Sequence, residues 1–224
     1  MVAVPNPRAY SSLIFDCDGV LLDSNRVKTA AFYEAALPFG SEVATRLVEY
    51  HKSLGGISRY EKFRYLLDHL VDDATRGPSY GQLLQRYARS VEVGLREARV
   101  AEALRELKAH TSESSWIVVS GSDQNELRRV LETKNIAHMF VGIFGSPDSK
   151  TDILAREFQA GTACKNALFL GDSRHDHEVA RAYGLDFVFV SGWTEFEGWR
   201  AYCAAQDIQT IDRVADLVPR SAPQ

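Results

Sequence analysis

The spacing of five short apolar runs is the feature that most constrains how this chain folds. The runs have the β-branched and aromatic content of buried strands, and they span residues 13–15, 116–119, 140–144, 167–170 and 187–190. Helical stretches such as residues 125–135 and 178–183 separate the later runs. Continuous apolar strands that alternate with helices are typical of a parallel sheet covered on both faces. We therefore predict an α/β fold with a doubly wound, Rossmann-like parallel sheet.

The distances between the ends of these runs indicate an insertion. The runs end at small or polar residues, and successive ends lie 104, 25, 26 and 20 residues apart. One strand-helix-strand unit takes roughly 30 residues, so the last three intervals are single crossovers and the first holds about 75–80 additional residues. A structureless loop of that length is implausible in a compact domain.

The additional segment has the pattern of helices. Asp23 or Ser24 can cap a helix that runs to residue 37, and a second helix begins at Ser41 and stops before Gly55 and Gly56. Residues 58–61 form a capping box that opens a helix to about residue 71, and a fourth helix spans about residues 82–98. We expect an inserted α-helical cap domain at residues 23–104, and a Rossmann-like catalytic core at residues 1–22 and 105–224.

Composition excludes several classes of protein. The apolar fraction of 45% and the charged fraction of 25% are those of an ordinary globular chain of 224 residues. The net charge of −4 lacks the basic excess that is typical of nucleic-acid-binding proteins. Three cysteines make no disulfide framework, no apolar run is long enough to span a membrane, and the first eight residues lack the pattern of a secretory signal. We expect a cytoplasmic protein without nucleic-acid or membrane partners. The pattern does not indicate an oligomeric state.

Polar residues gather where the predicted strands end, which is where ligands bind in open α/β sheets. In chain order they are Asp16, Asp18, Ser120, Gly121, Lys150, Asp172 and Asp176. Four carboxylates in one cleft are unfavourable unless a cation offsets them, and oxygen ligands suit Mg²⁺. A serine hydroxyl, backbone amides expected at a helix start and a lysine are donors for an anion. The set predicts a phosphate and magnesium site.

The motifs resemble those of the haloacid dehalogenase superfamily, from about residue 13 to residue 190. Residues 16–20 read Asp-Cys-Asp-Gly-Val, an apolar run ends in Ser120, Lys150 follows, and residues 171–176 read Gly-Asp-Ser-Arg-His-Asp. Within the superfamily, residues 55–59 resemble the cap loop of the β-phosphoglucomutase and phosphoglycolate phosphatase group. The second aspartate, Asp18, favours a phosphatase or phosphomutase over a dehalogenase, because dehalogenases of the family lack it.

The resemblance implies a role for each residue. Asp16 would attack phosphorus and form an aspartyl phosphate, while Asp18 would protonate the leaving group and later deprotonate water. Mg²⁺ would be held by the Asp16 carboxylate, the Asp18 carbonyl and the Asp172 carboxylate, with Asp176 behind them. Ser120, Gly121 and Lys150 would hold the phosphoryl oxygens.

Two cap residues are candidate substrate contacts. Arg59 opens a helix beside two glycines, so its guanidinium could reach a second anionic group on the substrate. Lys28, one turn into the first cap helix, could face the same cleft. The alternatives are a packing or surface role for Arg59 and a solvated Lys28.

We predict a Mg²⁺-dependent phosphoric monoester hydrolase that acts on a small phosphorylated metabolite such as a sugar phosphate or phosphoglycolate. One alternative is a phosphomutase of the β-phosphoglucomutase type, which would return the phosphoryl group to a sugar. A more remote alternative is a catalytically silent phosphate-binding or signalling module. Receiver-type signalling domains need only about half this length, and their phosphorylated aspartate lies on a different strand.

Overall fold

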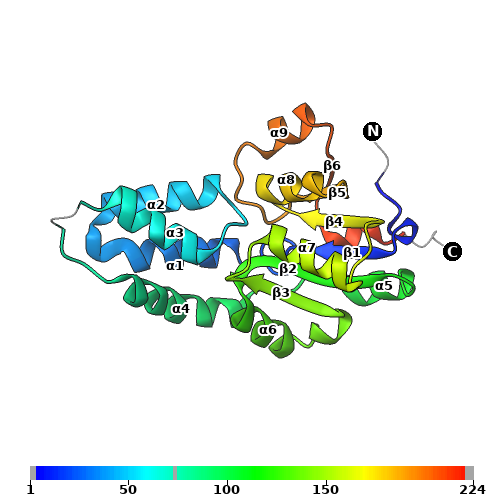
Figure 1. Ribbon diagram of the computed structural model, residues 1–224, viewed down its shortest axis with the longest axis horizontal. Coiled ribbons are helices and arrows are strands. Elements are labelled where there is room, and N and C mark those ends of the chain that lie inside the picture. The colour runs from blue at the N-terminus through cyan, green and yellow to red at the C-terminus, as the bar shows by residue number, and fades with distance from the viewer. Residues whose placement is uncertain (1–3, 73–74, 220–224) are drawn as a thin grey trace.

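The core of the protein is one parallel sheet of six strands, in the order β3-β2-β1-β4-β5-β6 (Figure 1). The computed structural model describes residues 4–72 and 75–219, so the start of the chain, for which we expect no secretory signal, lies partly outside it. The strands are β1 (Ser12–Phe15), β2 (Ser115–Asp123), β3 (Gly142–Ser146), β4 (Ala167–Gly171), β5 (Asp186–Val190) and β6 (Gln209–Ile211). The central strand β1 pairs with β2 on one side and with β4 on the other.

Both faces of the sheet are buried, because successive side chains of a strand point to opposite faces. On one face, Leu13 and Phe15 of β1 pack with α5 (Leu104–His110) and α6 (Gln124–Thr133). On the other, Ile14 packs with α7 (Lys150–Ala160) and α8 (Arg174–Ala182). Beyond β5, Trp199 of α9 (Trp199–Ala205) stacks on Phe189. The predicted doubly wound α/β fold is confirmed.

A helical layer lies between β1 and β2 in the chain and beside the sheet in space (Figure 1). It consists of α1 (Asn25–Ala36), α2 (Ser41–Ser53), α3 (Arg59–Tyr65), which continues as a π-helical turn η3 (Leu66–Leu70), and α4 (Tyr80–Glu97). These helices enclose a hydrophobic cluster of their own, distinct from the two clusters on the sheet. The separate cluster supports the proposed cap domain, whose boundaries remain a prediction.

The caps of these helices follow from the sequence. The Ser58 hydroxyl accepts a hydrogen bond from the Glu61 amide, and Ser79 forms a capping box with Gln82. Ser24 precedes α1 as predicted, but its hydroxyl makes no capping bond because it donates to the Asp18 carboxylate. The start of the first inserted helix is therefore tied to the loop that follows β1.

Two strands have bounds other than those predicted, and a third strand was not predicted. β2 extends to Asp123 rather than ending at residue 120, and β3 begins at Gly142, because Phe140 closes a short 3-10 turn and packs into the core. β6 was not predicted. Its three residues are too few to show a strand pattern, and pairing with β5 defines the strand.

Within residues 4–72 and 75–219, no helix combines the length and apolarity that crossing a membrane requires.

Candidate active site

Three neighbouring strand ends position the central acids. Asp16 follows β1, Asp172 follows β4, and the end of β2 carries Ser122, so all three lie at the carboxyl edge of the sheet. Asp16 and Asp172 are buried, at 3% and 6% exposure. The order β2-β1-β4 therefore brings together residues that are more than a hundred positions apart in the chain.

Three of the predicted acids form a tight cluster. Asp16, Asp172 and Asp176 each place one carboxylate oxygen within 4.8 Å of the others. Burial, against the opposing charge of Lys150, raises the pKa of Asp16 to about 7. Burial and then the Asp16 carboxylate raise the pKa of Asp172 well above its usual range. Such shifts mark carboxylates that lack enough positive charge around them.

Lys150 supplies part of that charge. Its Nζ lies 2.9 Å from Asp16 Oδ1 and 2.5 Å from Asp176 Oδ1, and the side chain is almost fully buried. Asp176 also forms a capping box with Ser173 at the start of α8, so it has a helix-capping role as well as a place in the cluster. Lys150 therefore holds the carboxylates of Asp16 and Asp176 in place from one side.

The cluster fits a hard divalent cation. Among the described residues, Asp16 Oδ1 is a buried oxygen that accepts no hydrogen bond of good geometry. The backbone at Gly19 leaves room beside Asp172, because a Cβ there would lie 2.1 Å from Asp172 Oδ2. The amide of Asn25 donates to that same oxygen at 2.7 Å and orients the carboxylate. An all-oxygen set of this kind suits Mg²⁺ with bound water.

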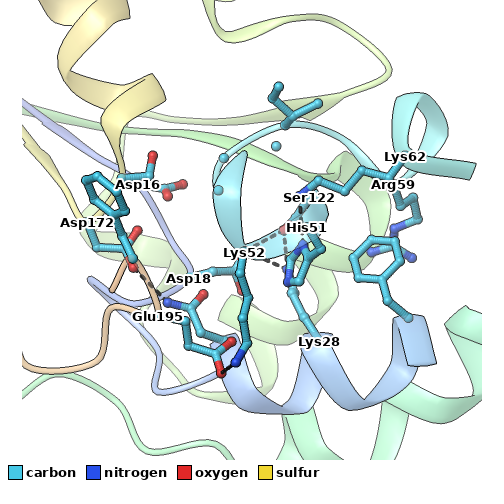
Figure 2. A pocket seen from close by; sticks show the side chains of 18 of the residues that line it. Asp16, Asp18, Lys28, His51, Lys52, Arg59, Lys62, Ser122, Asp172 and Glu195 are labelled. Carbon is cyan, nitrogen blue, oxygen red and sulfur yellow. Dashed lines mark hydrogen bonds and ion pairs between the residues drawn. The ribbon is translucent and has the colours of Figure 1, made fainter. Parts of the chain in front are cut away.

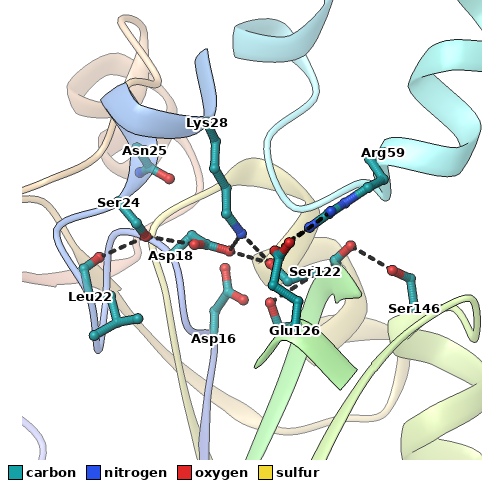
Figure 3. A network of polar contacts seen from close by, with 12 residues as sticks. Asp16, Asp18, Leu22, Ser24, Asn25, Lys28, Arg59, Ser122, Glu126 and Ser146 are labelled. Atoms are coloured by element: carbon teal, nitrogen blue, oxygen red, sulfur yellow. Dashed lines mark hydrogen bonds and ion pairs between the residues drawn. The ribbon is translucent and has the colours of Figure 1, made fainter. Parts of the chain in front are cut away.

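Asp18 has different surroundings from Asp16 (Figure 3). Its Oδ1 accepts a hydrogen bond from Ser24 at 2.6 Å, and its Oδ2 accepts from Lys28 at 2.5 Å and from Ser122 at 2.6 Å. Burial raises the pKa of Asp18, but the Lys28 charge and these hydrogen bonds outweigh it and hold the pKa at about 2. The Asp18 side chain is thus an ionised acceptor that faces the helical layer rather than the acidic cluster.

The end of β2 differs from the prediction. The Ser120 side chain is fully buried, and its hydroxyl accepts a hydrogen bond from the Ser122 amide. Gly121 and Ser122 line the cleft, but their amides lie in the strand and not at a helix start, because α6 begins at Gln124 with Asp123 as its cap. The expected helix-start amides are therefore corrected to strand-end amides.

The helical layer closes over this edge of the sheet (Figure 2). The loop at residues 55–57 lies so close to β2 that a Cβ on Gly121 would be 2.2 Å from the Gly56 carbonyl oxygen. The cleft between the two layers is lined on the helical side by Lys28, Phe32, His51, Lys52, Arg59, Lys62 and Tyr87. Cationic residues of the cap therefore face the acids of the core.

The structure places both candidate cap residues in this cleft, each with a carboxylate partner. Lys28 is buried and contacts Asp18 and Ser122, so it is not a solvated surface lysine. Arg59 directs both terminal nitrogens of its guanidinium at Glu126 of α6 and lies 4.4 Å from the centre of the Tyr87 ring. The substrate roles of Lys28 and Arg59 remain predictions.

Several parts of the site were not predicted: Ser24, Asn25, His51, Lys62, Glu126 and the hydroxyl of Ser122, of which only the backbone amide was expected to act. Ser24 was considered as a helix cap, but its bond to Asp18 depends on the fold of the loop. Ser122 stands two residues beyond Ser120, and the length of β2 decides which hydroxyl reaches the cleft. No local pattern indicates His51 or Glu126, because their partners lie on other helices.

A family model described as "Haloacid dehalogenase-like hydrolase" matches residues 13–190. The chain belongs to the haloacid dehalogenase-like hydrolase family. The match covers the residues that carry the predicted resemblance, so the family prediction is confirmed.

Relatives of this hydrolase include a phosphatase and solved structures of the same fold. A phosphoglycolate phosphatase of Pseudomonas putida is 29% identical over 220 residues, which cover 94% of this chain and 79% of the relative. The β-phosphoglucomutase of Clostridium difficile has a TM-score of 0.71 at 16% identity and covers 93% of both chains. CbbY of Rhodobacter sphaeroides, solved with phosphate, has a TM-score of 0.69 at 17% identity over 93% of this chain and 96% of its own.

At these identities the solved structures establish the fold alone. The predicted enzyme class, a phosphoric monoester hydrolase of this family, is confirmed.

Proposed function

We propose that this hydrolase is a Mg²⁺-dependent phosphatase that cleaves a small phosphorylated metabolite, such as a sugar phosphate or phosphoglycolate, through an aspartyl phosphate on Asp16. The observation that carries the proposal is the buried cluster of Asp16, Asp172 and Asp176 against Lys150, at the same strand edge as Asp18. One attacking carboxylate, cation ligands and fixed donors are the parts that phosphoryl transfer requires.

Asp16 is suited to be the nucleophile. Its carboxylate lies at the end of the central strand, and Oδ1 has no hydrogen-bond donor of good geometry among the described residues. A bound Mg²⁺, held by Asp16, Asp172 and the Asp18 carbonyl, would neutralise the crowded carboxylates and the phosphoryl oxygens. Lys150 keeps the nucleophile oriented and adds positive charge beside the transferred group.

Asp18 is suited to handle the protons of the reaction. Its carboxylate is within hydrogen-bond distance of Ser122 and Lys28, at the boundary between the two layers. Because the Asp18 carboxylate is ionised, it can act as a base and accept a proton from the hydrolytic water. To protonate the leaving oxygen it must first gain a proton and release one of these donors. Acid-base catalysis of this kind contributes about 10²–10⁴-fold.

The size of the cleft supports a small substrate. The cleft between the sheet and the helical layer has a volume of only about 70 Å³. The Gly56 loop covers this space against β2 and would exclude bulk water from the reaction.

The proposal is tested with the purified chain and p-nitrophenyl phosphate. We expect release of p-nitrophenol with Mg²⁺ and none with excess EDTA, and we expect Asp16→Asn to abolish turnover. Asp68→Asn changes an exposed acid in the helical layer in the same way and should turn over like the wild type. Wild-type turnover by Asp16→Asn would show that the assignment of the nucleophile is wrong.

A screen of phosphorylated metabolites separates hydrolysis from group transfer. A phosphatase releases inorganic phosphate from its substrate, whereas a phosphomutase forms an isomeric sugar phosphate that NMR detects. Isomer formation without phosphate release would replace the proposed reaction with the mutase reaction on the same Asp16. Mass spectrometry of an acid-quenched reaction should find one phosphoryl group on Asp16.

A further inference from the structure

Lys62 is a buried cation that the proposed chemistry does not use. It projects from α3 into the cleft, is 1% exposed, and its Nζ lies 2.7 Å from His51 Nδ1 of α2 (Figure 2). Taking an ammonium group out of water costs several kcal/mol unless an opposite charge lies nearby. A buried lysine that lines a binding cleft therefore needs a counter-charge.

The other cations of the cleft already have one. Lys28 pairs with Asp18, Arg59 pairs with Glu126, and Lys52 lies 4.0 Å from Glu195. In the part of the chain that the structure describes, no carboxylate lies within ion-pair distance of Lys62. Burial and then the Lys28 charge lower the pKa of Lys62 to about 7. The surroundings of Lys62 thus disfavour its ammonium form, and an anionic ligand would supply the counter-charge that the described residues do not.

The neighbours of Lys62 present donors and apolar rings. When the ammonium donates to His51 Nδ1, the ring proton of His51 is on Nε2, which makes His51 a donor as well. The Phe32 ring lies 5.5 Å from Lys62 Nζ, and its centre lies 4.5 Å from that of the His51 ring. Two donors against an aromatic wall form a compact site for an anionic oxygen group.

Lys62 and the nucleophile line the same small cleft. Asp16 lies on the sheet side and Lys62 on the helical side of a space of about 70 Å³, so one small molecule can touch both. We propose that the substrate carries a second anionic group, a carboxylate or a phosphate, which binds Lys62 and His51 while its phosphoryl group faces Asp16. This inference rests on the proposed function and narrows it to phosphate esters with two anionic ends.

The test compares substrates that differ only in the second group. One pair is 2-phosphoglycolate and its neutral amide, which tests a carboxylate. The other pair is ethylene glycol bisphosphate and 2-hydroxyethyl phosphate, which tests a phosphate. We expect the wild type to favour the more charged member of at least one pair in kcat/KM by about 10- to 100-fold, the range that a hydrogen bond to a charged group contributes.

Lys62→Met should bring that ratio close to one, because it removes the cation that binds the second anionic group. For each variant, the less charged member of the pair is the reference. Lys62→Gln is made in parallel, and the circular dichroism and melting temperature of each variant show that it is folded. Lys165→Met removes an exposed lysine of the core and should leave the ratio unchanged. The inference is overturned if the wild type has no preference in either pair, or if the preference survives in the folded Lys62 variants.

A binding measurement keeps this result separate from the proposed function. Failure of the wild type to cleave any phosphate ester with Mg²⁺ would refute the phosphatase proposal. The inference would then be read from melting temperatures, because a ligand stabilises the folded state that binds it. 2-Phosphoglycolate or the bisphosphate should raise the melting temperature of the wild type more than its neutral partner does. Equal shifts in both pairs would overturn the inference.

Discussion

Replacing Lys62 with methionine should change how the stability of the free enzyme depends on pH. The folded protein lowers the pKa of Lys62 from 10.5 to about 7, chiefly through burial. Between these two values the unfolded chain holds a proton that the folded chain has released. Because the unfolded state then binds more protons, the free energy of unfolding rises with pH in this range.

The size of the effect follows from the proton count. One proton of difference corresponds to about 1.4 kcal/mol per pH unit. From about pH 8 to about pH 9, the free energy of unfolding of the wild type should therefore rise by about 1.4 kcal/mol relative to that of Lys62→Met. His51, which contacts Lys62, and the charged groups that act on it, Lys28, Asp18, Glu61 and Lys150, are present in both proteins, so the difference isolates Lys62.

Urea unfolding of both proteins at the two pH values, followed by circular dichroism, measures this difference. Lys165→Met serves as the control and should follow the wild type. A difference that stays constant with pH would refute the reasoning, because Lys62 would then keep the same charge in both states. A difference that falls as pH rises would mean that the folded protein stabilises the ammonium. Saturating 2-phosphoglycolate should reduce the slope if an anion binds at Lys62.

The remaining predictions concern the loop at residues 55–57, the ion pair between Arg59 and Glu126, and the metal. Gly121→Ala should lower kcat/KM by about 10²-fold, because its Cβ would meet the Gly56 carbonyl oxygen at 2.2 Å and displace the loop at residues 55–57. Gly81→Ala, where a Cβ meets nothing within 4 Å, should leave kcat/KM unchanged. Arg59→Met should lower the free energy of unfolding by about 3–5 kcal/mol in urea titrations, since it leaves the largely buried Glu126 carboxylate unpaired, and Glu126→Gln added to it should recover part of that loss. Mg²⁺ at about 100 times its Kd should stabilise the wild type by about 2.7 kcal/mol in thermal melts, and a response as large in Asp172→Asn would contradict the assigned ligand.

Much of the fold could be predicted because strand and helix patterns are local. The five apolar runs indicated β1 to β5, and the parallel arrangement alone implied that Asp16 and Asp172 meet at one edge. β6 could not be predicted, since three residues carry no periodicity and pairing with β5 defines the strand.

The helical side of the site was less predictable because its contacts join distant elements. Arg59 and Glu126 are 67 positions apart, and nothing near either residue indicates the pair. Lys62 lies on a helix whose start the sequence predicted, but its burial depends on how α1 and α2 pack against α3. Only the tertiary structure shows that Lys28 has a carboxylate partner in the cleft and that Lys62 has none among residues 4–72 and 75–219.

Under the proposed function, the sheet and the four inserted helices have separate tasks. Asp16 and Asp172 follow strands of the sheet and Lys150 begins α7 on one face of that sheet, whereas Lys28, His51 and Lys62 belong to the inserted segment. Backbone hydrogen bonds join the two ends of that segment, from the Asp23 amide to the Arg99 carbonyl and from the Ala101 amide to the Leu21 carbonyl, so it leaves and returns at nearly the same place. With these proposed roles, a different set of helices between β1 and β2 would select a different substrate, while the reacting groups stayed the same. In such a protein the evolution of substrate choice does not have to rebuild the machinery that breaks the bond.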